Sequence, residues 1–322
     1  MSLKKKEAKV AVAAPLGKKK NPFIHDLKTN YNLYLMILPC LLMFVLFFYM
    51  PMYGVIISFK DYDMLDGIMM SPWADNFGFE HFVKFFTGRY AYRIIRNTLV
   101  LGFLNMICNF FPPIILAILM NEAKSVAFKK TVQTVTYLPY FVPIVVVVGM
   151  MQYMLGATGV VNTMLMSYGL EPINFMDNAA LFRPLYIASD IWQRTGWGSI
   201  VYMAAISGVD QQLYEAAYLD GANRFKRIWH ITIPGILPTI TIMLILNAAQ
   251  VVNVGYEKVF LMYRESMFEV SDVINTFVYR EGMTEKKFDY ATAVGLLNSV
   301  AATLIMLTTN KIVDKLNGTA LW

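Results

Sequence analysis

Six long apolar segments are the feature of this sequence that most restricts its fold. A helix needs roughly 20 apolar residues to cross a hydrocarbon core of about 30 Å, and only a helix or a closed barrel satisfies every backbone polar group in lipid. With 57% apolar and 16% charged residues, the chain has too few polar side chains to cover a soluble domain. We therefore predict an all-α polytopic membrane protein with six transmembrane helices, at residues 33–59, 94–120, 132–155, 185–206, 236–254 and 290–312.

The basic residues predict how the chain is oriented. A lysine-rich stretch precedes the first apolar segment, and positive charge concentrates on the cytoplasmic side of membrane proteins. We predict a basic cytoplasmic tail at residues 1–30, a transmembrane domain at residues 31–322, and both termini in the cytoplasm. The first apolar segment is too long for a cleavable signal peptide. The net charge of +6 is spread over separate loops, so we predict no nucleic-acid partner.

The cysteines and histidines form no pattern that is typical of an enzyme. Cys40 and Cys108 fall inside apolar segments and are expected to be buried thiols rather than part of a disulfide framework. The three histidines, His25, His81 and His230, lie in separate loops and predict neither a metal site nor a catalytic triad. The chain has no Gly-x-x-x-x-Gly-Lys-Ser/Thr phosphate loop. We predict that it has no enzymatic activity and binds no cofactor of its own.

Residues 207–235, between the fourth and fifth apolar segments, predict two short helices joined by a turn. Asp210 suits the N-cap of the first helix, and Gly221 suits the left-handed position that closes it. Asn223 suits the N-cap of the second helix, and Pro234 is expected to stop that helix. The basic residues around this helix-turn-helix place it on the cytoplasmic side.

The same segment resembles the EAA loop of type I ABC importer permeases, whose pattern is Glu, Ala, Ala, two residues, Asp, Gly, Ala, then Ile and Pro at fixed spacing. Every position of the pattern is filled, by Glu215, Ala216, Ala217, Asp220, Gly221, Ala222, Ile231 and Pro234. The resemblance implies the type I ABC permease fold. It also implies that residues 215–222 are a coupling helix that seats in a groove of an ATP-binding subunit, with Glu215 in polar contact there. An ordinary amphipathic connector is the alternative.

Further segments resemble the carbohydrate branch of that family, in particular the polysaccharide and oligosaccharide permeases of the LplB type, related to the larger maltose-permease subunit. These segments are residues 97–99, 138–141, 159–165 and 191–198. The resemblance implies an importer of oligosaccharides or polysaccharide fragments in a bacterial cell (inner or plasma) membrane. It also implies a heterodimer with a second homologous permease, two ATP-binding subunits that carry ATP and Mg, and an extracellular sugar-binding protein.

Polar side chains inside the fourth and fifth spans are candidates for the substrate path, because polar groups at membrane depth usually face a bundle interior or an aqueous cavity. Amides and aromatic rings suit the hydroxyls and the apolar face of a sugar. The candidates are Gln193, Arg194, Trp197, Asn247, Gln250, Asn253 and Tyr256, of which the three amides at 247, 250 and 253 form a stripe along the fifth helix. Interhelical hydrogen bonding is the alternative. Asp190 and Arg194 are four residues apart and could simply neutralise each other, but Arg194 is the key side chain for an acidic fragment.

Three other functions remain open from the sequence. An ABC permease for an amino acid, a peptide or phosphate would share residues 207–235, here called the coupling segment. An ion-coupled secondary transporter would be expected to show inverted repeats and buried carboxylates along an ion path, and neither is evident in the sequence. A non-transporting membrane protein would leave the complete EAA pattern without a role.

Overall fold

The computed structural model describes residues 29–318. In these residues the regular secondary structure is helical, apart from one isolated bridge between Lys60 and Trp73. The chain divides into two compact units, Met1–Val55 and Ile56–Trp322. The predicted tail at residues 1–30 lies almost entirely outside the described residues. The first unit contains α2 (Tyr31–Phe44), the π-helix η1 (Val45–Tyr49), α3 (Met50–Met52) and the beginning of the 3-10 helix η2 (Tyr53–Phe59). No residue of α2 is buried, which suits a helix surrounded by lipid.

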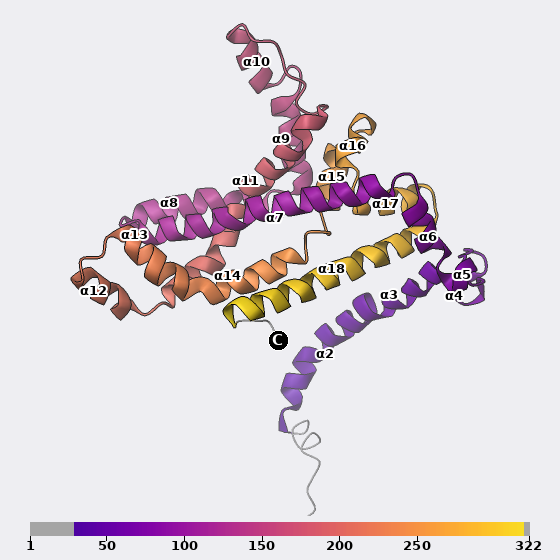
Figure 1. The fold of residues 1–322 in the computed structure, drawn as a ribbon, viewed down its shortest axis with the longest axis horizontal. Coiled ribbons are helices and arrows are strands. Elements are labelled where there is room, and N and C mark those ends of the chain that lie inside the picture. The colour runs from indigo at the N-terminus through magenta and orange to yellow at the C-terminus, as the bar shows by residue number, and fades with distance from the viewer. Residues whose placement is uncertain (1–28, 319–322) are drawn as a thin grey trace, which may run out of the picture. The chain divides into compact units, whose positions relative to one another are not determined.

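The second unit is built around two long helices, α7 (Ala91–Glu122) and α11 (Ala179–Ser207), which pack against each other. In Figure 1, α14 (Ile233–Ala248) and α18 (Phe288–Asn317) run together beside them. A Cβ added to Gly102 in α7 would lie 1.7 Å from the carbonyl oxygen of Val251. Glycine therefore permits the close approach of α7 to the chain that follows α14.

Five helices are long and apolar enough to span a membrane, so the chain is an all-helical polytopic membrane protein. They are Tyr31–Phe59, Ala91–Glu122, Ile144–Ser167, Arg224–Ala248 and Phe288–Lys315. The expected span at residues 185–206 does form a helix, α11, of 29 residues. It is absent from the five because Arg183, Asp190 and Arg194 lower its hydropathy.

The expected span at residues 132–155 is broken in two. It consists of α8 (Val126–Tyr137), the 3-10 helix η3 (Leu138–Phe141) and α9 (Ile144–Leu155), which is followed by α10 (Val160–Ser167). The break falls at Val142, whose ψ of 123° is extended. A proline disfavours the helical conformation of the residue before it, and Pro143 follows directly.

Short helices fill the two long connections of the second unit. Between the first apolar segment and α7 lie α4 (Gly67–Met70), α5 (Asp75–Gly78) and α6 (Glu80–Thr87). Between α14 and α18 lie α15 (Tyr256–Met262), η5 (Glu265–Met267), α16 (Phe268–Ser271), α17 (Ile274–Tyr279) and the π-helix η6 (Arg280–Thr284). This second connection is largely buried, and Val259 and Val273 belong to a core cluster with Leu101 of α7 and Tyr186 of α11.

The two cysteines are less buried than the sequence predicted. Cys40 is exposed and Cys108 is half-buried. Cys40 lies on α2, none of whose residues is buried. Its place in an apolar segment therefore did not mean that other parts of the protein cover it.

Candidate functional site

The segment between α11 and α14 has the helix-turn-helix form predicted from its sequence. The first helix is α12 (Gln211–Leu219), and the Asp210 carboxylate accepts a hydrogen bond from the Gln212 N–H at 2.9 Å. Gly221 has a φ of +74°, the left-handed conformation in which a helix commonly ends. The Asn223 side chain accepts from the Lys226 N–H at 2.9 Å and caps α13 (Arg224–Arg227). The N-cap, closing glycine and second cap are all confirmed.

Pro234 does not stop the second helix, so that expectation is wrong. The helix continues through the π-helix η4 (Ile228–Thr232) into α14, as one helix from Arg224 to Ala248. A proline ring clashes with the carbonyl four residues earlier in a regular α-helix. The wider π-turn immediately before Pro234 changes that geometry, and the proline then occupies the first turn of α14.

α12 leaves most of its surface unpacked in this chain. None of its residues is buried, and Leu219 and Tyr218 are 86% and 70% exposed. The Tyr214 hydroxyl and the buried Thr232 hydroxyl lie 2.9 Å apart and attach α12 to η4. Glu215 lines an open hollow of about 430 Å³ with Tyr214, Tyr218 and Arg227 among its neighbours. The arrangement presents an exposed carboxylate beside large apolar side chains.

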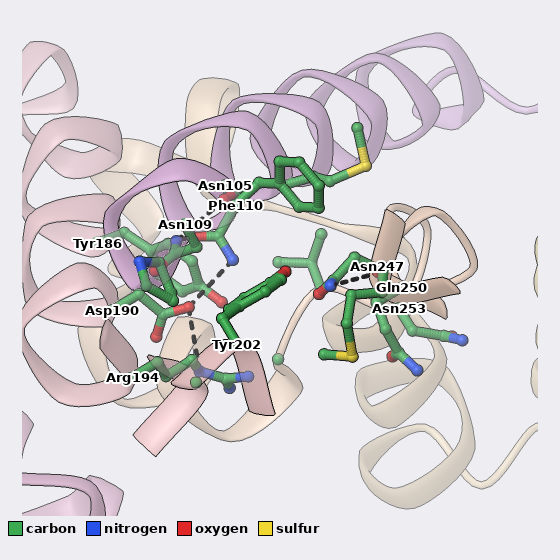
Figure 2. A pocket seen from close by; sticks show the side chains of 17 residues that line it. Asn105, Asn109, Phe110, Tyr186, Asp190, Arg194, Tyr202, Asn247, Gln250 and Asn253 are labelled. Atoms are coloured by element: carbon green, nitrogen blue, oxygen red, sulfur yellow. Dashed lines mark hydrogen bonds and ion pairs between the residues drawn. The ribbon is translucent and has the colours of Figure 1, made fainter. Parts of the chain in front are cut away.

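A second site lies between α7, α11 and the end of α14. It is a cavity of about 250 Å³, shown in Figure 2. Asn105 and Asn109 reach it from α7, and Tyr186, Asp190, Arg194 and Tyr202 from α11. Asn247, Gln250 and Asn253 occupy the side opposite Asp190 and Arg194 in this view.

Asp190 is the electrostatic centre of this cavity. One carboxylate oxygen lies 2.8 Å from the Lys258 ammonium. The other accepts from the Asn105 amide at 3.0 Å and lies 3.5 Å from the Arg194 guanidinium. The Lys258 and Asp190 side chains are 3% and 2% exposed, whereas the Arg194 side chain is 63% exposed. Lys258 therefore neutralises Asp190 inside the protein, and Arg194 remains available to the cavity.

Lys258 is held by three contacts in the described residues. Its ammonium also donates to the Tyr186 carbonyl at 3.0 Å and lies 4.6 Å from the centre of the Tyr186 ring. Burial lowers the pKa of Lys258 below its ordinary value, and the Asp190 carboxylate opposes that change.

The predicted amide stripe is wrong as a helical stripe, yet its residues do meet at the cavity. α14 ends at Ala248, so Gln250 and Asn253 lie in the turns that follow rather than on the helix. The Asn247 amide donates to the Met243 carbonyl at 2.7 Å, and Asn253 accepts from Asn298 at 3.0 Å. Glycine at 255, where the chain begins α15, lines the same cavity.

The remaining predicted path residues lie around the cavity rather than in it. Gln193 donates to the Val142 carbonyl at 2.8 Å. It lines an adjoining hollow of about 460 Å³ with Arg194, Tyr256 and Glu257. Trp197 stacks on Tyr140 with ring centres 4.7 Å apart and is not among the residues that line either hollow.

Sequence reasoning missed three polar contributors to the site. Asn105 and Asn109 are amides four residues apart inside an apolar span, the same signal that identified Asn247. Lys258 lies 68 residues from Asp190, and nothing local in the sequence pairs them. The expected ion pair between Asp190 and Arg194 does exist, but Lys258 is the closer and more buried partner.

The chain is similar to known transport proteins over most of its length. Residues 113–317 match the family described as "Binding-protein-dependent transport system inner membrane component". Protein LplB of Bacillus subtilis (strain 168) is 41% identical over 97% of this chain and 96% of LplB. The polygalacturonan/rhamnogalacturonan transport system permease protein YteP of the same organism is 40% identical over 95% of this chain and 94% of YteP.

Two solved structures also resemble this chain closely. A chain of a bacterial ABC transporter involved in the import of the acidic polysaccharide alginate has a TM-score of 0.84 and 40% identity, with 92% of this chain and 100% of that chain covered. A second structure contains the bacterial alginate ABC transporter in complex with an alginate pentasaccharide-bound periplasmic protein. Its matching chain has a TM-score of 0.83 and 40% identity, with 92% of this chain and 99% of that chain covered. The chain therefore belongs to the family of binding-protein-dependent transport system inner membrane components: it is a multi-pass inner-membrane permease subunit of an ABC transporter and is not itself an ATPase.

Proposed function

We propose that this permease imports acidic oligosaccharides or polysaccharide fragments and that they pass the cavity at Asp190. The observation that carries the proposal is an exposed guanidinium, Arg194, in a cavity whose other polar side chains belong to Asp190, five amides and two tyrosines. The relatives YteP and the alginate transporter have names that specify polygalacturonan, rhamnogalacturonan and alginate. The names of these relatives support an acidic saccharide as the substrate, and the Arg194 guanidinium in the cavity is a group that can bind its carboxylates.

The charge arrangement suits a substrate that carries carboxylates. Asp190 and Arg194 are the charged residues that line the cavity, and Lys258 already neutralises Asp190 at 2.8 Å. The charge of Arg194 is therefore available for a substrate carboxylate, with which a guanidinium forms paired hydrogen bonds. When Arg194 turns to a substrate, Asp190 keeps its bonds to Lys258 and Asn105.

The amides around Arg194 suit the neutral part of a sugar. Each amide offers both a donor and an acceptor, and hydroxyl groups need both. The Asn109 carbonyl oxygen is buried and has no hydrogen-bond partner among the described residues. Asn109 lines the cavity as a residue, but this oxygen is closed to solvent, and the Asn109 amide nitrogen donates to Asn105.

We further propose that α11 crosses the membrane as the sixth span, in addition to the five candidate spans. Its 29 residues would extend roughly 43 Å at 1.5 Å per residue, which exceeds the hydrocarbon core. The pairing of Asp190 with Lys258 reduces the cost of placing a carboxylate at membrane depth. With six spans both termini lie in the cytoplasm, and α12 and α13 lie on the cytoplasmic face.

The exposed coupling segment would then dock on an ATP-binding subunit. Glu215 and the exposed apolar residues of α12 are the surface for that contact. The complete importer would hold a second homologous permease, two ATP-binding subunits carrying ATP and Mg, and an extracellular sugar-binding protein. A periplasmic binding protein forms part of the alginate transporter complex, which supports this composition.

The test is substrate-stimulated ATP hydrolysis by the complete complex in proteoliposomes, with its binding protein and a series of acidic and neutral oligosaccharides of equal length. We expect stimulation by acidic oligosaccharides and a loss of that preference in Arg194→Gln. Arg96→Gln is the matched control, because 46% of the Arg96 side chain is exposed but Arg96 lies outside the cavity. Stimulation by an amino acid or peptide, or an acidic preference that persists in Arg194→Gln, would contradict the proposal.

A further inference from the structure

A cluster of ligand atoms lies away from both the cavity and the coupling segment, where the chain before α7 meets the beginning of α18. It consists of Asp61, His81 of α6 and Asp289 of α18. The sequence predicted a scattered, solvated His81 and no metal site, but the structure buries His81, which is 5% exposed. One ligand atom from each of the three residues lies within 4.8 Å of the others.

The imidazole Nε2 of His81 faces three oxygen atoms. It lies 3.0 Å from the Lys60 carbonyl oxygen, 3.5 Å from the Asp61 carboxylate and 3.8 Å from the Asp289 carboxylate. Zinc binds nitrogen and oxygen at about 2.0–2.2 Å, and a tetrahedral site therefore separates its ligand atoms by roughly 3.4 Å. The three separations bracket that value. The separations from the imidazole nitrogen are therefore those of ligands that share one ion.

The two carboxylates of the cluster have few partners of opposite charge. The Asp61 and Asp289 carboxylates form no ion pair in the described residues apart from these contacts with His81. Lys60 is adjacent in sequence, but its ammonium donates to the carbonyls of residues 68, 69 and 71. A divalent cation between the two carboxylates would balance their two negative charges.

The Asp289 carboxylate is held in a fixed orientation. One of its oxygens accepts from the Tyr62 N–H at 3.3 Å and the other from the Tyr290 N–H at 2.7 Å. Backbone donors of this kind orient a ligating carboxylate. The oxygen that faces His81 is therefore positioned by the chain before any ion arrives.

We propose that His81, Asp61, Asp289 and the Lys60 carbonyl bind a divalent first-row transition ion, Mn²⁺ or Zn²⁺. The imidazole nitrogen favours these ions over Ca²⁺ and Mg²⁺, which prefer oxygen ligands alone. The ion joins residues 60–81 to the first turn of α18, more than 200 residues away in sequence. It fixes the segment before α7 against the last span of the second unit.

The competing arrangement is a simple hydrogen bond. In it His81 donates an N–H to the Lys60 carbonyl, and the carboxylates merely lie nearby. The His81 Nδ1 is buried without a partner among the described residues in either case. The substitution His81→Gln separates the two, because a glutamine amide can donate to the same carbonyl but is a poor ligand for these ions.

The experiment uses the full transporter complex, purified in detergent through a tag without histidine, treated with EDTA and dialysed against Mn²⁺ or Zn²⁺. Elemental analysis and the midpoint of thermal unfolding are measured for wild type, His81→Gln and Asp61→Asn. Asp61 is half-exposed, with 52% of its side chain accessible, so its substitution leaves the fold intact. Asp75→Asn is the control, since Asp75 lies in the same connection but outside the cluster.

We expect one more ion per complex in wild type and in Asp75→Asn than in the other two variants. We also expect Mn²⁺ or Zn²⁺ to raise the unfolding midpoint by a few degrees only where the extra ion is bound. Equal ion content in wild type and His81→Gln would overturn the proposal and leave the hydrogen bond. An equal rise in the midpoint for all variants would overturn it as well, because the stabilisation would then come from another site.

Discussion

Replacing Lys258 by methionine tests whether the buried ion pair with Asp190 holds α15 to α11. The substitution keeps an unbranched side chain of similar length and removes the charge. Asp190, whose side chain is 2% exposed, then loses the ammonium at 2.8 Å. Removal of one partner from a buried ion pair typically costs 3–5 kcal/mol, since the other charge stays uncompensated.

The structure places the expected cost at the lower end of that range. Asp190 keeps its hydrogen bond from Asn105 at 3.0 Å and its contact with Arg194 at 3.5 Å. We therefore expect Lys258→Met to lower the free energy of unfolding by about 3 kcal/mol, which is roughly a hundredfold change in the folding equilibrium. The double variant Lys258→Met with Asp190→Leu removes both charges and should recover much of that loss.

The assay is denaturant-induced unfolding in detergent, followed by tryptophan fluorescence, for wild type, both single variants and the double variant. A double-mutant cycle then isolates the interaction between the two side chains. A loss below about 1 kcal/mol for Lys258→Met, or single effects that simply add in the double variant, would refute the argument that this pair is the principal neutralisation of Asp190.

Three further predictions follow from single positions. Glu215→Lys should abolish substrate-stimulated ATP hydrolysis without lowering the yield of the permease, because Glu215 is exposed and bonds to nothing in the described chain; normal stimulation would contradict its coupling role. Gly102→Ala should lower the unfolding free energy by roughly 1–3 kcal/mol, because its Cβ would meet the Val251 carbonyl oxygen at 1.7 Å; Gly149→Ala, with no atom within 4 Å, is the control and should not be destabilised. Gly221→Ala should lower the free energy of unfolding by about 1–2 kcal/mol, because Gly221 has a φ of +74°. Equal stability of the variant and wild type would show that the turn can adopt another conformation.

Local features of the coupling segment were predictable because short-range chemistry determines them. The caps at Asp210 and Asn223 need only an acceptor near the first N–H groups of a helix. The turn at Gly221 needs only a residue without a Cβ. Pro234 failed as a helix stop because a π-turn directly precedes it, and a rule for proline in a regular α-helix does not include that geometry.

The cavity was predictable only in part. Amides at 247, 250 and 253 were identified because polar groups are costly in an apolar segment, and they do line the cavity. The end of α14 at Ala248 was missed since residues 249–254 remain apolar enough to extend a helical pattern. The contacts of Asp190 with Asn105 and Lys258 join residues 85 and 68 positions apart, and no local pattern records such pairs.

The cavity and the coupling segment are linked by the two helices that flank that segment. α11 carries Asp190 and Arg194 and ends at Ser207, and the helix that continues from α13 carries Asn247 in its last turn. Arg194 is 13 residues before Ser207 and Asn247 is 13 residues after Pro234, so each lies roughly 20 Å along its helix from the coupling segment. α12 is joined to Ser207 by the short connection before its first residue, and Tyr214, near its middle, bonds to Thr232 of η4. If α12 docks on an ATP-binding subunit as proposed, a displacement of α12 would act on the cavity through these two helices, and a change in the separation between Arg194 and Asn247 would report it.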